Sequence, residues 1–152
     1  MVRQRLENDQ VVWYPRTKKL AQHVEGVQRR ATALVRSIAH LSYDQRIRKL
    51  GLFSLQYRHQ RNDTIHVWKL LNGKLDGEFP WLNLDTDSRV RGHSLKLRKD
   101  RSEASHLNFS YRVVNEWNSL SDTVVTAKTV DTFEKRLDKF WADRIYEHPL
   151  YL

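Results

Sequence analysis

His59, Asp63 and His66 follow one another at steps of four and three residues in the stretch SLQYRHQRNDTIHVWKLLNG, residues 54–73. On a helix this spacing places the three side chains on one face, and two imidazoles with a carboxylate are ligands that zinc accepts. However, His66 lies about 10 Å along the axis from His59 at a rise of ~1.5 Å per residue, so the three side chains do not converge on one ion. We therefore interpret this face as solvated or phosphate-facing, with a structural histidine as the next alternative and a metal site as the last.

No other pattern in the sequence indicates a catalytic site. The nearest pair of carboxylates, Asp85 and Asp87 in LDTDS, has no third partner and lies in an expected loop, which favours turn acids over a two-metal site. No serine lies in a glycine-flanked elbow, and the 5 glycines form no phosphate-binding loop. The absence of cysteine excludes disulfides, Cys-ligated zinc and thiol nucleophiles. We predict no catalytic residues, no metal ligands and no cofactors in this chain.

Positive charge is concentrated in one part of the chain. The formal net charge is +9, and residues 16–61 carry 11 Lys and Arg against only Glu25 and Asp44. A second basic cluster lies at residues 89–101. Such a concentration predicts a polyanionic partner, nucleic acid before membrane, that is contacted through its phosphates. The expected contact residues are Lys18, Arg29, Arg30, Arg36, Arg58, Arg61, Arg91, Lys96, Arg98 and Lys99.

The sequence predicts an intracellular chain, nuclear or cytoplasmic, with no membrane partner. Its start, MVRQRLENDQ, has no apolar core of signal-peptide length. No apolar run approaches the ~20 residues that a membrane-spanning helix needs.

The elements that position these residues are predicted to be mainly α, with about four main helices and an irregular basic middle segment. The first helix, over about residues 16–39, begins after Pro15. Its predicted buried stripe is Leu20, Val24, Val27, Ala31, Leu34 and Ile38. The opposite, outward face is predicted to hold Lys18, Gln22, Glu25, Arg29, Thr32 and Arg36.

Local signals define the next two helices. Ser42 and Gln45 fit a capping box at the start of a short helix, and Gly51 suits the left-handed turn that ends it. The third helix occupies residues 54–73 and closes at Asn72 and Gly73. Its predicted buried face is Tyr57, Thr64, Val67, Trp68 and Leu71, which leaves His59, His66 and Arg58 towards solvent.

The last third of the chain is expected to form two helices that pack on each other. Residues 74–104 before them are predicted to be irregular, with Leu95 and Leu97 in a brief strand. One helical face holds Phe109, Val113, Trp117 and Leu120, and the other holds Phe133, Leu137, Phe140 or Trp141, and Ile145. Asp131 with Glu134 is the expected cap of the last helix. Trp68, Trp117 and Trp141 are predicted to be core residues.

Four segments follow from these patterns. Residues 1–15 form an atypical leader, 16–73 a basic helical subdomain, 74–104 an irregular basic connector, and 105–152 a helical hairpin with a tail.

Five ordered blocks give the chain a family resemblance. The blocks are PRTKKL…VEGVQRRATALV, LSYDQRIRKLGLFSLQYRHQRNDTIHVWKLLNG, RGHSLKLRK, NFSYRVVNEWNSL and TVDTFEKRLDKFW. Their order and spacing, from Val11 to Trp141, resemble the segment that follows the catalytic domain in jockey-type non-LTR (LINE) retrotransposon endonuclease/reverse transcriptase polyproteins.

The resemblance implies a fragment of the C-terminal, thumb-like accessory region of an RNA-directed DNA polymerase. Such a region would hold RNA or an RNA–DNA duplex through its phosphates, beside a polymerase domain or a second copy of itself. The Tyr-x-Asp-Asp turn of the polymerase and an endonuclease domain are absent from this chain, so we do not expect it to be an enzyme alone. Two alternatives are a helical protein–protein interaction module and a non-functional relic of a truncated element.

Overall fold

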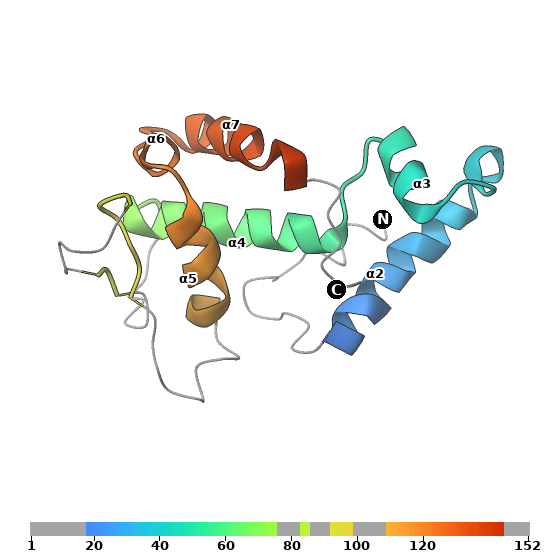
Figure 1. Cartoon of the computed structure of the whole chain (residues 1–152), viewed down its shortest axis with the longest axis horizontal. Helices are drawn as coiled ribbons and strands as arrows, with labels where there is room; N and C mark the ends of the chain where they lie inside the picture. Colours follow the sequence, from blue (N-terminus) through green and yellow to red (C-terminus); the bar gives the residue numbers. More distant parts are fainter. Residues whose placement is uncertain (1–17, 76–82, 86–91, 99–108, 145–152) are drawn as a thin grey trace. The chain divides into compact units, whose positions relative to one another are not determined.

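The computed structural model describes residues 18–75, 83–85, 92–98 and 109–144. The described part is mainly helical, which confirms the predicted fold class (Figure 1). Its α-helices are α2 (Lys18–Ala33), α3 (Tyr43–Lys49), α4 (Leu55–Leu71), α5 (Phe109–Ser119), α6 (Asp122–Val125) and α7 (Val130–Phe140). Short 3-10 turns, η1 and η3, occupy Arg36–Ile38 and Ala142–Arg144.

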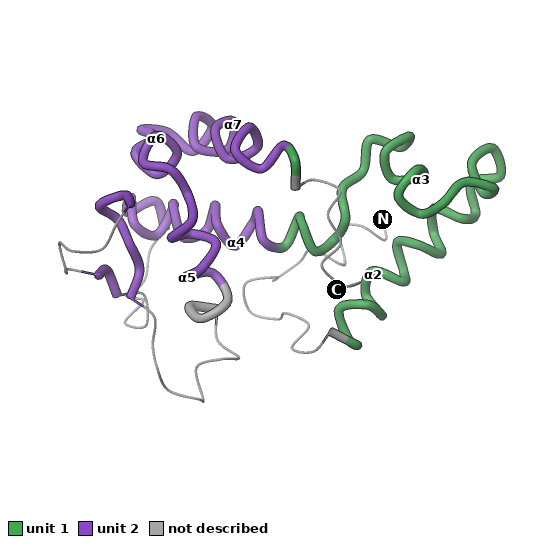
Figure 2. The backbone as a smooth tube through the Cα atoms, viewed as in Figure 1, with its two compact units in different colours: residues 1–59, 143–152 green, residues 60–142 purple. Residues whose placement is uncertain are grey.

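The chain divides into two compact units (Figure 2). Unit 1 comprises Met1–His59 with Asp143–Leu152, and unit 2 comprises Gln60–Ala142. The division falls inside α4, whereas the sequence predicts a segment boundary at residue 73. Each unit is described by itself below.

Helix α2 is shorter than predicted. It ends at Ala33, Val35 is extended with φ −77° and ψ 98°, and residues 36–38 form the separate turn η1. The segment between α2 and α3 is stabilised by a side chain of α3, because Arg46 donates through Nη1 to the carbonyl oxygen of Leu41 at 2.6 Å. It also lets Ile38 enter the core, which a straight helix to residue 39 would not do.

The predicted buried face of α2 is wrong. Leu20 and Leu34 are 49% and 83% exposed, while Glu25, Gln28 and Thr32 are buried. The buried polar face is turned by about 110° from the apolar stripe, at ~100° per residue. Burial of these polar groups is tolerated because each has a hydrogen-bond partner outside its own helical turn.

The local signals at the ends of α3 and α4 are confirmed. The Ser42 hydroxyl accepts from the amide of Gln45 at 3.3 Å, and Gln45 Oε1 accepts from the amide of Ser42 at 3.0 Å. Gly51 and Gly73, both with φ 61°, lie in the left-handed region after α3 and α4.

Unit 2 has the aromatic core that the sequence predicts. Trp68 of α4 stacks on Phe133 of α7 at 5.5 Å between ring centroids, and Trp117 of α5 lies 6.1 Å from the same ring. Trp141 is also buried, whereas Phe140 is 44% exposed, so Trp141 continues the buried face of α7. Ile145 lies outside the described residues.

Helix α7 begins differently from the prediction. Thr129 is the N-cap, and its hydroxyl accepts from the amide of Thr132 at 3.2 Å. The predicted Asp131–Glu134 cap is wrong, because α7 begins at Val130 and both acids lie inside the helix. Asp131 instead pairs with Lys135 at 2.8 Å.

Residues 92–98 form a loop that is fastened on two sides. The predicted strand is reduced to a single antiparallel bridge between Leu84 and Leu97 in the described part of the connector. On the other side, the Asn118 side chain of α5 accepts from the Leu97 amide and donates to the Leu97 carbonyl, both at 2.8 Å. Trp117 Nε1 donates to the Leu95 carbonyl at 2.7 Å. Hydrogen bonds therefore hold this loop against the C-terminal end of α5.

Candidate nucleic-acid interface

Beneath the basic surface of unit 1 lies a network of polar side chains. The Tyr43 hydroxyl donates to Glu25 Oε1, and the amide of Leu55 donates to both Glu25 oxygens at 3.3 and 3.0 Å. Gln28 Nε2 donates to the Tyr43 hydroxyl and to the Phe53 carbonyl, each at 2.9 Å. Burial, followed by the hydrogen bond to Glu25, raises the pKa of Tyr43 far above its ordinary value, so Tyr43 stays neutral. The network connects α2 to α3 and to the start of α4.

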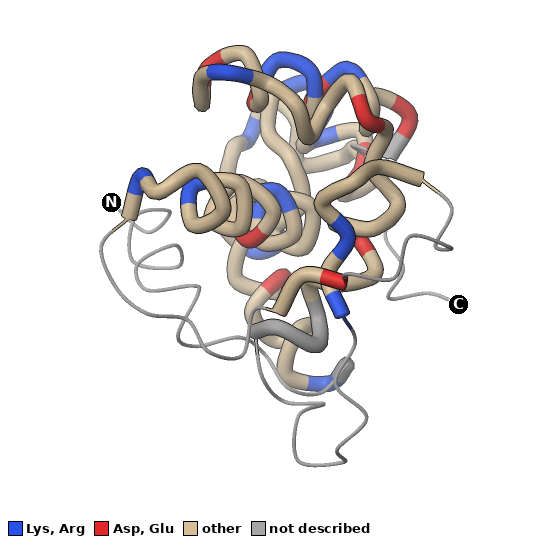
Figure 3. Tube along the Cα trace, turned by 90° about the vertical axis from the view of Figure 1, so that its left-hand side faces the viewer, with Lys and Arg blue, Asp and Glu red and all other residues tan. Residues whose placement is uncertain are grey.

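This network removes the acid of α2 from the surface. Glu25 is buried, and its carboxylate is surrounded by donors. Between residues 19 and 59, Asp44 is therefore the exposed acid, and six Lys and Arg side chains are exposed as well. These cations, which we call the basic face of unit 1, are Lys19, Arg29, Arg30, Arg36, Arg48 and Lys49. Figure 3 marks the Lys and Arg positions in blue and the Asp and Glu positions in red.

Two arginines pack around the ring of Tyr43. The Arg29 guanidinium lies 5.0 Å from the ring centroid and the Arg46 guanidinium lies 6.0 Å from it. Arg29 is exposed, so its guanidinium is held against an aromatic ring at the surface of α2. Arg46 is buried, and it donates from Nε to Thr32 Oγ1 at 3.2 Å as well as to carbonyl oxygens. Arg46, one of the 11 cations of the basic segment, thus stabilises the interior and is not part of the surface.

The predicted contact residues of unit 1 have mixed positions. Arg29, Arg30 and Arg36 are exposed, in agreement with a surface role, while Arg58 is half-buried. The side chain of Lys18 lies outside the described residues. Lys19, Arg48 and Lys49 were not singled out from the sequence. The sequence signal that could have identified these three cations is their position in the same basic segment. Hydropathy does not separate exposed from buried cations within that segment.

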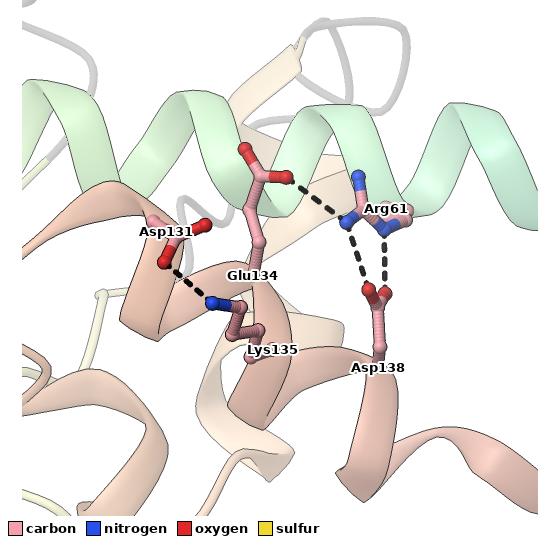
Figure 4. Close-up of polar contacts among 5 residues, drawn as sticks. All are labelled: Arg61, Asp131, Glu134, Lys135 and Asp138. Carbon is pink, nitrogen blue, oxygen red and sulfur yellow. Dashed lines mark hydrogen bonds and ion pairs between the residues drawn. The ribbon is translucent and has the colours of Figure 1, made fainter.

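Arg61 is engaged inside unit 2 (Figure 4). Its Nε and Nη2 donate to the two oxygens of Asp138 at 2.6 and 2.9 Å, and Nη2 also reaches Glu134 at 3.1 Å. Hydrogen bonding to Asp138 raises the pKa of Arg61 above its ordinary value. This forked pair joins α4 to α7, so we do not include Arg61 in the basic face.

The loop cations are also divided. The Lys96 ammonium donates to the carbonyl oxygen of Asn118 near the end of α5, a position where the helix dipole favours positive charge. A Cβ on Gly92, which has φ 116°, would lie 2.5 Å from that ammonium. Arg98 is exposed, while Arg91 and Lys99 lie outside the described residues. Lys96 therefore attaches the loop to α5.

The predicted outward face of α4 is wrong at His59. His59 and Asp63 are buried, at 3% and 4% exposure, which favours the structural histidine over a solvated or phosphate-facing face. His66 is half-buried, and burial together with Lys69 lowers its pKa. Within the described ranges, no three His, Cys, Asp or Glu side chains are grouped to hold a metal ion. Trp13, Trp81 and Asp87 lie outside these ranges, and Asp85 is half-buried.

No protein-family model, curated protein or solved structure matches this chain. Among the described helices, none is long and apolar enough to span a membrane. The functional argument therefore depends on the geometry of the basic face.

Proposed function

We propose that the basic face of unit 1 binds the phosphate backbone of RNA or of an RNA–DNA duplex, in the manner of a thumb-like accessory region of an RNA-directed DNA polymerase. The observation that carries this proposal is the separation of charge in unit 1. Six exposed cations share the surface of residues 19–59 with Asp44, because Glu25 is turned into the interior. Phosphate binding needs a surface of this sign, and it releases counterions from the nucleic acid.

The chemistry of the face favours positioning over base recognition. Its members are Lys and Arg, which contact phosphate oxygens without reading sequence. Arg29 is held against the Tyr43 ring, so part of its conformational entropy is lost before a ligand arrives. We infer a surface that holds a duplex or a structured RNA in register and is indifferent to its sequence.

The test is fluorescence anisotropy of the purified chain with a labelled structured RNA, an RNA–DNA duplex and a duplex DNA. The titrations are repeated across salt from about 50 to 200 mM. If about five phosphates are contacted, the log–log slope of affinity against salt is near −4 to −5 on duplex. Preference for RNA or for the RNA–DNA duplex supports the accessory role. Weak, salt-insensitive binding by a chain whose circular dichroism is helical contradicts the proposal.

A pair of matched variants locates the surface. The double variant Arg30→Gln and Arg36→Gln removes two exposed cations from unit 1 and is expected to weaken binding about tenfold with a shallower salt slope. The control, Lys135→Gln with Lys139→Gln, removes the same charge from the exposed side of α7. Equal losses in both doubles would show a response to net charge alone and would contradict the assignment to this face.

A further inference from the structure

An apolar seam runs along the outside of α2. Its members, at spacings of four and three residues, are Leu20, Val24, Val27 and Ala31 within α2, and Leu34 directly after its end. Leu20, Ala31 and Leu34 are exposed, while Val24 and Val27 are half-buried. This alternating spacing is that of the a and d positions of a coiled coil. At ~1.5 Å per residue its helical part, from Leu20 to Ala31, is about 16 Å long, which is enough for one helix to lie along it.

In the described part of unit 1, the seam contributes no fully buried side chain to the interior. Helix α2 lies beside α3 (Figure 1), and the side chains it buries are Glu25, Gln28 and Thr32. Their hydrogen bonds to α3 and to the start of α4 fix the rotation of α2 about its axis. The seam is thereby held on the outside by specific polar contacts, since rotating it inward would break them.

The two edges of the seam differ in charge and in access. One edge contains Gln28, which is buried by hydrogen bonds to Tyr43 and Phe53. The other edge contains His23 and Arg30, both exposed. The accessible edge thus carries the positive charge of Arg30, and the acid of α2 is not available to neutralise it.

We propose that this seam is the docking site for an acidic amphipathic helix of a partner protein. The apolar side of that helix would cover Leu20 to Leu34, and its carboxylates would lie along the edge of His23 and Arg30. This is the helix-in-groove mode of recognition, in which apolar anchors supply affinity and flanking charges select the partner.

A second copy of the chain fits the seam less well. Antiparallel pairing of two seams would bring the edge with His23 and Arg30 against the same edge of the other copy, which offers Arg30 no carboxylate. Parallel pairing would bring that edge against the Gln28 edge, which unit 1 already buries. An acidic partner avoids both costs.

The probe is a synthetic helical peptide with Leu at the a and d positions and Glu at e and g. Its binding to the full chain is measured by fluorescence anisotropy. Two control peptides keep the length: one has the apolar positions shuffled, and the other has Lys in place of Glu. We expect binding of the acidic peptide alone. Failure of the acidic peptide to bind, or equal binding of the Lys peptide, overturns the proposal.

Variants of the chain connect the binding to the seam. Leu20→Gln with Leu34→Gln is expected to weaken peptide binding at least about tenfold, because two exposed anchors are lost while helix propensity is almost unchanged. The control, Leu50→Gln with Phe140→Gln, removes two exposed apolar side chains elsewhere and should leave the affinity unchanged. Equal effects of the two doubles overturn the proposal.

Three further readouts separate this proposal from others. RNA affinity should be unchanged in Leu20→Gln with Leu34→Gln, so loss of peptide binding and loss of RNA binding are distinguishable. A dimer in sedimentation equilibrium that the same double variant dissociates would assign the seam to a second copy instead. Binding of anionic vesicles that the double variant abolishes would assign it to a lipid surface. Either of the last two results overturns the proposal.

Discussion

Unit 1 buries a polar network beside its apolar side chains, whereas the core of unit 2 is built around aromatic rings. In unit 1 a carboxylate, an amide and a guanidinium are buried between α2 and α3 beside Ile38 and Ile47, while Leu20 and Leu34 are exposed. In unit 2 the rings of Trp68, Trp117 and Phe133 fill the space between α4, α5 and α7. Apolar contacts depend mainly on area, but hydrogen bonds require both partners in place. The two units should therefore fail in different ways when single residues are changed.

The largest effect is expected at the centre of the aromatic core. Phe133→Ala removes a fully buried ring that contacts two tryptophans, and it should lower the free energy of unfolding by about 3–5 kcal/mol. Denaturant unfolding followed by tryptophan fluorescence measures this loss. Phe140→Ala, on an exposed side chain of the same helix, is the control and should cost little. Similar losses in both variants would show that the stacked rings do not stabilise unit 2.

A smaller but more localised effect is expected at Glu25. Glu25→Ala leaves the Tyr43 hydroxyl and the Leu55 amide without their acceptor, which should cost about 2–3 kcal/mol. Hydrogen exchange should show faster exchange at the Leu55 amide before other amides of α4.

The conservative variant Glu25→Gln keeps one carbonyl acceptor and should fall between the wild type and Glu25→Ala. An unchanged Leu55 exchange rate in both variants would contradict a polar core in unit 1.

Arg61 distinguishes a structural cation from a binding cation. Arg61→Met breaks the forked pair with Asp138 and the contact with Glu134, and it should cost about 1 kcal/mol because the carboxylates are partly solvated. RNA affinity should stay close to that of the wild type, in contrast to Arg30→Gln with Arg36→Gln. Stability comes from thermal unfolding and affinity from the same anisotropy assay.

Lys135→Met breaks the exposed pair with Asp131 within α7 and should change neither the stability nor the RNA affinity. If Arg61→Met instead weakened RNA binding as much as the double variant, Arg61 would belong to the binding surface.

The smallest effect is a pH dependence in unit 2. Burial lowers the pKa of His93, although its hydrogen bond with the Trp117 carbonyl opposes this shift. The unfolded state therefore takes up a proton near the ordinary value of 6.5, while the folded state resists it. Stability is full above about pH 6.5 and decreases as the pH falls below that value. His66 shifts in the same direction.

Thermal unfolding between about pH 5 and 7.5 measures this dependence. His93→Gln keeps a donor for the Trp117 carbonyl and should make the profile flatter. Identical profiles for the wild type and His93→Gln would contradict the assignment to His93.

The elements that the sequence predicted well are those set by neighbouring residues. Ser42 and Gln45 meet within one turn, and Gly51 and Gly73 end their helices through their own backbone. The rotation of α2 could not be predicted in this way, because it depends on partners from 18 and 30 residues away along the chain. Hydropathy ranks Leu20 as buried and Glu25 as exposed, and the long-range hydrogen bonds reverse both.

The candidate site shows the same limit. Charge counting located the basic segment that contains Arg30 and Arg36, and both are exposed. It could not separate them from Arg46 and Arg61, whose partners come from other elements. Sequence composition therefore predicts the sign of a surface more readily than its members.

The contact between Asn118 and Leu97 also affects the chemical stability of the protein during storage. The Asn118 amide acts as a substitute peptide group, with one oxygen that accepts and one nitrogen that donates. Asparagine is a heat-labile residue, and hydrolysis of its amide to aspartate would replace the donor by a second oxygen. That oxygen would face the Leu97 carbonyl, so one chemical event at a single side chain would weaken the attachment of residues 92–98, while the hydrogen bonds of Trp117 to Leu95 and of Lys96 to Asn118 remain. Storage time and temperature would then act on this loop before they act on the fold.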